Sequence, residues 1–373
     1  MKDYDIVFVS GLPWSFVKQR HHHVARRLAI KNRVFFIEPQ VSIITQLRSK
    51  GGKRVVNCAN SLYLIKPYPG VPFKKRLPWL YPLNGLVAAV SVKNVLNILG
   101  LKRHILWVTT PEGYFYINIL KSDLVVYDCL DDFASFPGVP GGIISCLDRK
   151  LSQAADIVFA TANRLFEMKS TLNQNCHLIP NGVDSELFSQ HGGGLETIFS
   201  LGKPVIGYIG VISDWLDFEL IRVLATNRPH YSFVFVGPLK TRLPPNLPDN
   251  VHFLGQYPYE QIPAVIRSFD VGIIPFLINP LTTSTNPVKV YEYLAIGIPV
   301  VSSDLPELRP MAERGYVGIA GSTIEWLSLL DQAVEEQNAA MRQARRSFAM
   351  NCASWESRIQ AMETVINLKI GEN

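Results

Sequence analysis

The amino-acid sequence predicts an α/β protein built from two doubly wound, Rossmann-like domains that face each other across a cleft. Short apolar runs alternate with amphipathic helical stretches along almost the whole chain, a pattern typical of parallel sheets covered by helices. The 373 residues suffice for about two domains at ~150 residues each. With 47% hydrophobic and 18% charged residues, the chain can form large cores and is not disordered.

Seven strands are expected in the first half, and several are apolar throughout, as strands buried on both faces are. The expected strands are Asp5–Ser10, Arg33–Pro39, Leu62–Pro67, His104–Thr109, Asp123–Asp128, Asp156–Thr161 and His177–Pro180. The helices expected between them are Phe16–Ile30, Gly85–Leu99, Gly113–Leu120, Ile143–Ala154 and Arg164–Leu172.

A second series of elements begins at Lys203, after a turn at Asn181–Asp184 and a glycine-rich hinge at His191–Gly194. Its expected strands are Pro204–Ile209, Tyr231–Val236, Val251–Leu254, Asp270–Pro275, Ile298–Ser302 and Tyr316–Ile319. Its expected helices are Phe218–Thr226, Tyr259–Ser268, Val288–Ala295, Ile324–Glu336 and Asn338–Ala349. We place a first domain at residues 1–188, a second at 203–350, and a last helix at 354–373 that crosses back to the first domain.

The positive charge of the chain is concentrated near its beginning. Residues 1–103 contain 18 Lys and Arg against 3 Asp and Glu, whereas the remainder contains 19 basic and 28 acidic residues. This asymmetry predicts an anionic partner for the first part of the chain. Nucleic acid is not favoured, because no nucleic-acid-binding motif accompanies the charge.

The cysteine pattern and the apolar runs indicate a cytoplasmic protein. The five cysteines are scattered, odd in number and without metal-ligand spacing, which is typical of reduced thiols. The sequence opens with charged residues before an apolar strand, so no signal peptide is expected. No uncharged apolar run reaches the ~18 residues that a membrane span needs.

Residues 286–304 predict a nucleotide-binding helix. Pro287 suits a first helical turn, Gly297 ends the helix, and an apolar strand follows. A helix N-terminus presents free N–H groups and positive partial charge, which suit phosphate. Lys289 and Glu292, three residues apart, lie on one face of the first turn. The lysine suits phosphate and the carboxylate suits ribose hydroxyls.

Taken together, the motifs resemble GT-B glycosyltransferases of the bacterial family 4-like branch, to which teichuronic-acid and exopolysaccharide transferases belong. The resemblance covers essentially the whole chain. Besides residues 286–304, the segments on which the resemblance rests are QRHHHVARRLA (19–29), VYDCLDDF (126–133), LIPNGVD (178–184), GYIGVISDW (207–215), FVGP (235–238), VHFLGQYPYEQIP (251–263) and DVGIIPF (270–276).

The resemblance implies a donor site for a nucleotide-sugar. Glu292 would bind the ribose and Lys289 would act as a point charge near the diphosphate. Gly210 would let the backbone approach the donor phosphates. The same donor-binding set includes Asn286, Pro287 and Val288. The alternatives are an exposed first-turn glutamate, a solvated lysine and a plain glycine turn.

The sequence departs from the family pattern at two places. Many retaining members carry a glutamate at the position of Ser284, and a cation pair in the region of Ser213–Asp217, where this chain has none. The retaining label is therefore not carried over, and the stereochemical outcome stays open.

An inverting transfer needs a general base for the acceptor hydroxyl. The strand Leu124–Tyr127 delivers Asp128, Asp131 and Asp132 to its carboxyl end, where crowded carboxylates would raise at least one pKa. Asp131 and then Asp132 are the candidates, and helix capping or solvation is the alternative. His23 is a third catalytic candidate.

The acceptor side is expected to include Gly11, Trp14, Arg20 and His22, which follow the first strand. Three adjacent histidines point in different directions on a helix, so they do not make a metal site. Except at His23, a solvated or capping role is the expected one. Arg20 is expected to pair with the aspartates or with an acceptor phosphate.

Two basic segments, Arg48–Arg54 and Lys74–Tyr81, predict contact with an anionic membrane surface, the second of them through cations interleaved with aromatics. A solvated basic surface is the alternative.

We therefore expect a cytoplasmic glycosyltransferase, associated with the inner face of the cell membrane, that moves a sugar from a UDP-sugar to a lipid-linked or other membrane-associated glycan. Neither a metal nor a cofactor is expected. A catalytically silent sugar-binding homologue and a nucleotide-sugar epimerase are the alternatives.

Overall fold

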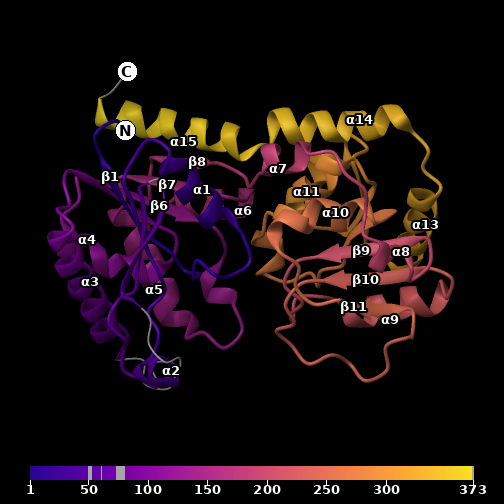
Figure 1. The fold of residues 1–373 in the computed structure, drawn as a ribbon, viewed down its shortest axis with the longest axis horizontal. Helices are drawn as coiled ribbons and strands as arrows, with labels where there is room; N and C mark the ends of the chain where they lie inside the picture. The colour runs from indigo at the N-terminus through magenta and orange to yellow at the C-terminus, as the bar shows by residue number, and fades with distance from the viewer. Residues whose placement is uncertain (49–52, 60, 73–79, 372–373) are drawn as a thin grey trace. The chain divides into compact units, whose positions relative to one another are not determined.

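The computed structural model describes residues 1–48, 53–59, 61–72 and 80–371. The chain divides into two compact units, the first comprising residues 1–180 and 359–373 and the second residues 181–358. Each unit is an open sheet covered by helices (Figure 1). The predicted fold class, two doubly wound α/β domains, is confirmed.

The sheet of the first unit has the strand order β3-β4-β2-β1-β5-β6-β7-β8. All neighbours are parallel except β3 and β4, which are antiparallel. The strands are β1 Asp5–Val9, β2 Val34–Ile37, β3 Val55–Ala59, β4 Leu62–Ile65, β5 His104–Val108, β6 Leu124–Cys129, β7 Ile157–Ala160 and β8 Cys176–Leu178. All seven predicted strands are present, and β3 was not predicted.

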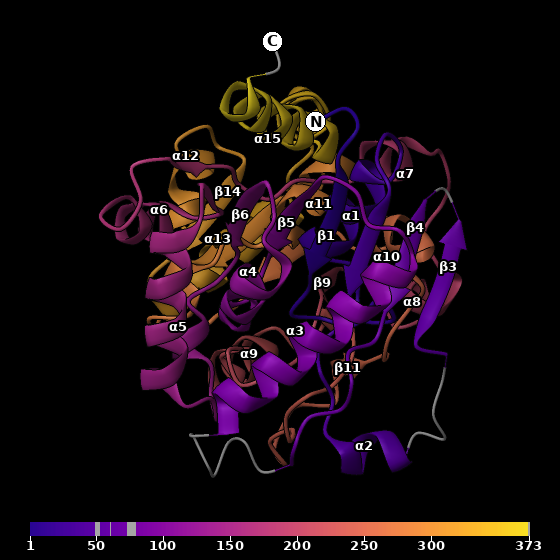
Figure 2. The same cartoon turned by 90° about the vertical axis from the view of Figure 1, so that its left-hand side faces the viewer.

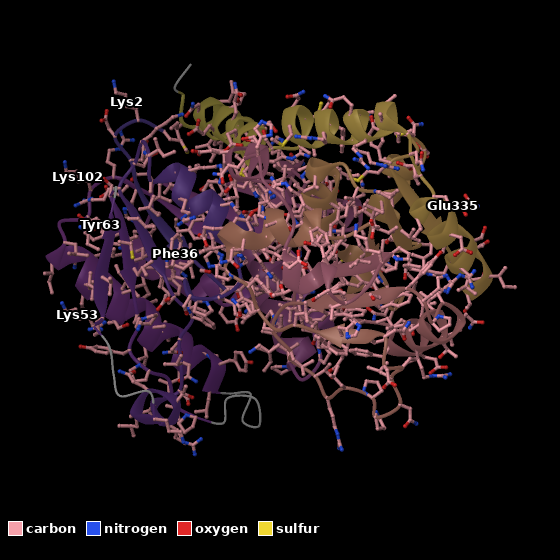
Figure 3. The ribbon with its side chains drawn as sticks, turned by 45° about the vertical axis from the view of Figure 1, so that its right-hand side comes forward. Lys2, Phe36, Lys53, Tyr63, Lys102 and Glu335 are labelled. Carbon is pink, nitrogen blue, oxygen red and sulfur yellow. The ribbon has the colours of Figure 1, made fainter. Side chains whose placement is uncertain are left out.

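Helices cover both faces of this sheet. They are α1 Arg20–Leu28, α2 Ile43–Arg48, α3 Leu80–Ile98, α4 Tyr114–Leu120, α5 Gly141–Ala154, α6 Asn163–Ser170 and α15 Trp355–Ile370. Residues of α3, α4 and α5 share one core with alternate strand residues such as Val7 and Phe35. The intervening strand residues, including Phe36, form the opposite core with α1 and α15. In Figure 2, α15 lies above α3, α4 and α5. In Figure 3, Lys2 and Lys102 lie at the edge of the first unit, whereas Phe36 lies further inside it.

The second unit contains one parallel sheet with the order β11-β10-β9-β12-β13-β14. Its strands are β9 Val205–Ile209, β10 Ser232–Val236, β11 Val251–Phe253, β12 Val271–Ile274, β13 Val300–Ser303 and β14 Val317–Ala320, as predicted within two residues. Its helices are α7 Ser185–Ser189, α8 Glu196–Phe199, α9 Phe218–Asn227, α10 Ile262–Arg267, α11 Val288–Ile296, α12 Arg309–Ala312, α13 Thr323–Val334 and α14 Ala339–Ser347. α7, α8 and α12, of four or five residues each, were not predicted.

The first helix begins later than predicted. The pattern predicts a helix from Phe16, whereas α1 starts at Arg20 because Gln19 forms a capping box with His22. The Gln19 backbone N–H donates to His22 Nδ1 over 3.1 Å, and this bond fixes the entry of the chain into the helix.

Candidate donor and acceptor sites

In the second unit, two glycines shape the turns that follow β9 and β10. Gly210 has φ +122° and Gly237 has φ +150°, a region that side-chain-bearing residues rarely adopt. A Cβ at Gly237 would lie 1.9 Å from the carbonyl oxygen of Gly210. The two turns therefore touch through their backbones, and both positions require glycine.

The helix α11 begins beside these turns. Pro287 is its N-cap residue, with φ −70° and ψ 118°, rather than a residue of the first turn as predicted. The helix ends at Gly297 with φ +89°, as predicted. Its first backbone N–H groups have no acceptor four residues earlier within the helix, which is the general basis of anion binding at helix N-termini.

Lys289 is held between aromatic rings next to Gly210. Its Nζ donates to the Tyr208 hydroxyl over 3.2 Å and lies 4.5 Å from the Tyr208 ring centroid and 4.7 Å from that of Phe276. A Cβ at Gly210 would lie 3.2 Å from this Nζ. Burial lowers the pKa of Lys289 to about 7, although the Glu292 carboxylate opposes that shift.

Glu292 is buried one turn further along α11. Burial raises its pKa to about 7, with Asp184 acting in the same direction. The positive charge of Lys289 and a hydrogen bond from the Tyr259 hydroxyl oppose the shift. The carboxyl group thus has both a cation and a hydroxyl donor as neighbours.

A lysine and a glutamate in this arrangement have complementary abilities. An ammonium group short of water gains most by meeting an anion such as phosphate. A carboxylate can accept two hydroxyl hydrogen bonds, as a ribose diol would offer. Lys289 lies in the first turn of α11 beside the Gly210 turn, and Glu292 follows one turn later, so the local chemistry suits a nucleotide phosphate and its ribose.

Asn286 has a structural role that the sequence did not reveal. Its Oδ1 accepts hydrogen bonds from the Asn181 backbone N–H over 3.0 Å and from the Tyr291 hydroxyl over 3.1 Å. Its carbonyl oxygen accepts from Asn181 Nδ2 over 2.6 Å. Asn286 therefore fastens the 181–184 turn to the start of α11.

Ser284 is fully buried, and its hydroxyl donates to the Pro280 carbonyl over 2.9 Å. The position of the family's sugar-binding carboxylate is therefore occupied by a hydroxyl that bonds within its own segment. In the region 213–217, Asp217 accepts from the Leu220 N–H over 2.9 Å and so caps α9.

In the first unit, Arg20 and Asp128 form a buried ion pair. Arg20 Nη2 lies 2.9 Å from Asp128 Oδ1, and its Nε donates to the same carboxylate over 3.0 Å. Arg20 Nη1 donates to the carbonyls of Ile179 and Pro180 over 2.9 and 3.0 Å. Of the two partners expected for Arg20, the aspartate cluster is the one observed, through Asp128. Asp128 is fully buried and does not share an exposed cluster with Asp131 and Asp132.

Asp131 and Asp132 follow β6 and are both half-buried. The carboxylate of Asp132 accepts a hydrogen bond from the Ser135 hydroxyl over 2.6 Å. The backbone carbonyl of Asp131 accepts from the Phe133 N–H over 3.0 Å. Their catalytic assignment remains a prediction.

The three adjacent histidines are all buried, so none has the solvated role that was expected for two of them. His22 caps α1 as anticipated, and its Nε2 lies 3.2 Å from the Pro13 carbonyl. His23 Nδ1 lies 3.4 Å from Arg27 Nη1. His21 is the histidine next to Gly11, since a Cβ at Gly11 would lie 3.9 Å from His21 Nε2. Burial lowers the pKa of His21 to about 3.

The loop after β1 is fixed by hydrogen bonds to neighbouring strands. Gly11 N–H donates to the Thr109 hydroxyl over 3.2 Å, and Trp14 N–H donates to Glu38 Oε1 over 2.9 Å. The Trp14 ring packs against His22, with 5.3 Å between ring centroids. Gly11, Trp14 and His22 therefore belong to one cluster at the carboxyl end of β1.

Two aromatic residues of the donor site were missed from the sequence. Tyr208 accepts a hydrogen bond from Lys289, and the Tyr259 hydroxyl lowers the pKa of Glu292. Both lie in motifs that carried the resemblance, GYIG and QYPYEQIP. A buried tyrosine hydroxyl usually needs a polar partner, so the sequence could have indicated that each has one. Which charged side chain lies beside each hydroxyl depends on tertiary packing. Among the described residues, no group of three or more His, Cys, Asp or Glu side chains is placed to hold a metal ion.

Comparison with solved structures identifies the fold. Sucrose-phosphate synthase from Thermosynechococcus elongatus superposes with a TM-score of 0.78 at 14% identity, covering 99% of both chains. HepE of Anabaena, solved in complex with UDP-glucose, superposes with a TM-score of 0.67 at 15% identity, covering 97% of this chain and 99% of that one. The chain therefore has the GT-B fold of two Rossmann-like α/β domains.

Sequence comparison shows similarity to glycosyltransferases over parts of the chain. Residues 203–334 match the family described as "Glycosyl transferases group 1". The chain is 30% identical over 240 residues to "Putative teichuronic acid biosynthesis glycosyltransferase TuaH" of Bacillus subtilis (strain 168), which covers 58% of this chain and 59% of the relative. It is 28% identical over 156 residues to "Putative glycosyltransferase EpsF" of the same organism, over 38% and 39%.

The matches thus span less than two thirds of either relative. The matched family and both relatives agree with the resemblance to GT-B, family 4-like glycosyltransferases that the sequence predicted.

The Arg20–Asp128 pair leads to a stability prediction. Arg20→Ala leaves a fully buried carboxylate without its cation, so we expect a loss of about 3–5 kcal/mol in the free energy of unfolding. Urea unfolding measures this loss. Lys31→Ala is the control, because it removes the largely exposed pair with Glu363 and should cost no more than about 1 kcal/mol. Equal stability of the two variants would contradict the structural role of Arg20.

Proposed function

We propose that the protein is a glycosyltransferase that moves a sugar from a UDP-sugar to a lipid-linked or other membrane-associated glycan in polysaccharide biosynthesis. The observation that carries this proposal is the Lys289–Glu292 pair at the start of α11, held against Gly210 and supported by Tyr208 and Tyr259. It lies within the segment that matches the glycosyl transferases group 1 family.

Two of the similar solved structures support the choice of a UDP-sugar as donor. The Anabaena protein was solved with UDP-glucose, and the trehalose-6-phosphate enzyme from E. coli with UDP-2-fluoro glucose. By analogy, Lys289 and the N–H groups of α11 neutralise the diphosphate, and Glu292 accepts the ribose hydroxyls. Gly210, Pro287 and Val288 bring backbone close to the donor, and Asn286 positions that segment. This scheme assigns no step to a metal or a cofactor.

The name of one Bacillus relative, a putative teichuronic acid biosynthesis glycosyltransferase, supports polysaccharide biosynthesis as the setting. In our scheme Asp131, with Asp132 beside it, takes the proton of the acceptor hydroxyl as that oxygen attacks the anomeric carbon. The bond from the anomeric carbon to the phosphate oxygen breaks, and UDP leaves. His23, Arg20 and His22 then support the acceptor side from α1, together with Gly11 and Trp14. The protein would work in the cytoplasm, at the inner face of the membrane.

Ser284 favours one alternative, a homologue that binds nucleotide-sugar or glycan without turnover. Where a sugar-binding carboxylate would stand, the chain has a buried hydroxyl that is already hydrogen-bonded. Donor binding and turnover therefore need separate tests.

The donor site is tested by calorimetry with UDP. Lys289→Met removes a charge-assisted contact to phosphate worth about 1.5–3 kcal/mol, so we expect UDP affinity to fall by at least about tenfold. Glu292→Gln is expected to weaken binding in the same direction. Lys203→Met and Glu313→Gln are controls, since both side chains are exposed elsewhere in the second unit. Unchanged affinity in Lys289→Met would refute this assignment.

Proton uptake provides a second test of Lys289. In the free protein its pKa is about 7, so at pH 8 the amine is mostly neutral, whereas UDP is fully ionised because a terminal phosphate titrates near ~6. Bound diphosphate raises the pKa of Lys289, and binding therefore takes up close to one proton. Calorimetry at pH 8 in buffers of different ionisation enthalpy measures this uptake. Lys289→Met should abolish it, and a buffer-independent enthalpy in the unaltered protein would count against a lysine at the phosphate.

Turnover is tested by the release of UDP from a panel of UDP-, GDP- and TDP-sugars, with and without a lipid-linked acceptor. We expect release from one UDP-sugar, accelerated by acceptor. Asp131→Asn with Asp132→Asn should lower kcat by about 100-fold or more, the usual contribution of general base catalysis, without lowering UDP affinity. Binding without release from any donor would favour the silent homologue, and full turnover in the double variant would remove the two aspartates as the base.

A further inference from the structure

Exposed apolar side chains are concentrated in one part of the first unit. Of the 19 large hydrophobic residues that are exposed in the described part of the chain, 12 lie between residues 41 and 98. Scattered exposed apolar residues are normal, but a contiguous group marks a site of interaction.

The helix α3 is apolar on both faces along its first half. Ala88, Val92 and Leu96 are among the residues that pack inward. On the outward face, Leu83, Leu86, Val87 and Val90 are 37–46% exposed and follow the three- and four-residue spacing of one helix face. A helix that is apolar all round is typical of a buried helix. The outward face becomes polar only afterwards, at Lys93, Asn94 and Asn97.

The short helix α2 carries a second group of exposed apolar side chains. Ile43, Ile44 and Leu47 are all exposed, Leu47 by 77%, and no residue of α2 is buried. The segment at Gly70 joins α2 to α3: the Gly70 carbonyl accepts from Ile43 N–H over 3.0 Å, and Val71 N–H donates to Asn84 Oδ1 of α3 over 2.7 Å. Figures 1 and 2 place both helices in the lower part of the first unit. We call Ile43, Ile44, Leu47, Leu83, Leu86 and Val87 the α2–α3 surface.

The charge around the α2–α3 surface has one sign. The sequence contains no Asp or Glu from Pro39 to Pro111, but 11 Lys and Arg. Of these, Arg48 ends α2 and Lys93 lies on α3, both exposed. The guanidinium of Arg54 lies 3.8 Å from the Tyr68 ring centroid and donates to the Ser91 carbonyl of α3 over 3.3 Å. Lys53, which precedes it, points outward in Figure 3. Within the two predicted basic segments, residues 49–52 and 73–79 lie outside the described residues.

We propose that the α2–α3 surface docks on an anionic lipid bilayer, with its apolar side chains inserted between headgroups and with Arg48, Arg54 and Lys93 contacting lipid phosphates. Apolar side chains flanked by cations are the chemistry of interfacial binding. A second copy of the chain fits less well, because a symmetric contact would bring two cationic surfaces together without carboxylates. No helix in the described part of the chain is long and apolar enough to cross a bilayer.

This inference deepens the proposed function by naming the surface through which the enzyme meets its membrane-associated acceptor, and it rests on that function for its purpose. The sequence predicted membrane contact through the basic segments Arg48–Arg54 and Lys74–Tyr81, the second with interleaved aromatics. The structure adds a specific apolar surface on elements separate from the donor site. The insertion of apolar side chains can therefore be tested apart from the attraction of cations to lipid phosphates.

Vesicle flotation of the full chain tests the proposal, with phosphatidylcholine vesicles and with vesicles containing 30% phosphatidylglycerol. We expect binding to the anionic vesicles and at least tenfold weaker binding to the neutral ones. The triple variant Leu83→Gln, Leu86→Gln, Val87→Gln should lower the partition coefficient on anionic vesicles at least tenfold. The pair Ile324→Gln, Leu368→Gln is the control, because these exposed residues lie outside the surface, and should change binding less than twofold.

Undiminished binding of the triple variant would overturn the proposal. So would a change from dimer to monomer in light scattering, which would make the surface a contact between copies. Urea unfolding of the same samples confirms that the variant is folded, and calorimetry with UDP confirms that the proposed donor site in the second unit is unaffected. Vesicle binding without UDP binding in the unaltered protein would refute the proposed function alone, and UDP binding without vesicle binding would refute the docking surface alone.

Discussion

The proposed donor site depends on two ionisable groups that are kept short of water at the start of one helix. Burial shifts the pKa values of Lys289 and Glu292 in opposite directions until both stand at about 7. Each group then gains by meeting a ligand, the amine an anion and the carboxyl hydroxyl donors. The supports are local and rigid: a glycine turn that leaves room for the lysine, and the hydroxyls of Tyr208 and Tyr259.

In the first unit, by contrast, the buried cation Arg20 is already paired. Arg20 is satisfied within its own unit by the Asp128 carboxylate and by two carbonyls at the end of β8. A cation with that many partners has little further free energy to gain from binding a ligand. Its removal lowers the stability of the fold, because the partner carboxylate stays buried without a counter-charge. Lys289 has one hydroxyl and two ring faces instead. The number of strong internal partners therefore separates a structural cation from one that remains available to bind.

The fold was predictable from the sequence because buried parallel strands are apolar throughout and stand out from amphipathic helices. The strand β3 escaped because it is an antiparallel edge strand with an irregular register against β4, and Val55–Ala59 lacks a continuous apolar run. The positions of Lys289 and Glu292 on α11 and of Gly210 in the turn after β9 were predictable from local sequence. Their role in binding a donor stays a prediction. The pairing of Arg20 with Asp128, 108 residues apart, and the burial of all three histidines depend on tertiary packing, which spacing along the chain does not reveal.

The α2–α3 surface follows from combining both kinds of information. The sequence alone gives a long segment with cations and no carboxylates, and charge of that kind is compatible with a solvated face. The structure adds that α3 presents leucine and valine outward in its first half, where no packing inside the unit requires them. Exposed leucines lower solubility and are retained in soluble folds mainly where something covers them. Cations beside them favour an anionic cover, and a bilayer supplies both the apolar interior and the phosphate surface that this part of the chain lacks.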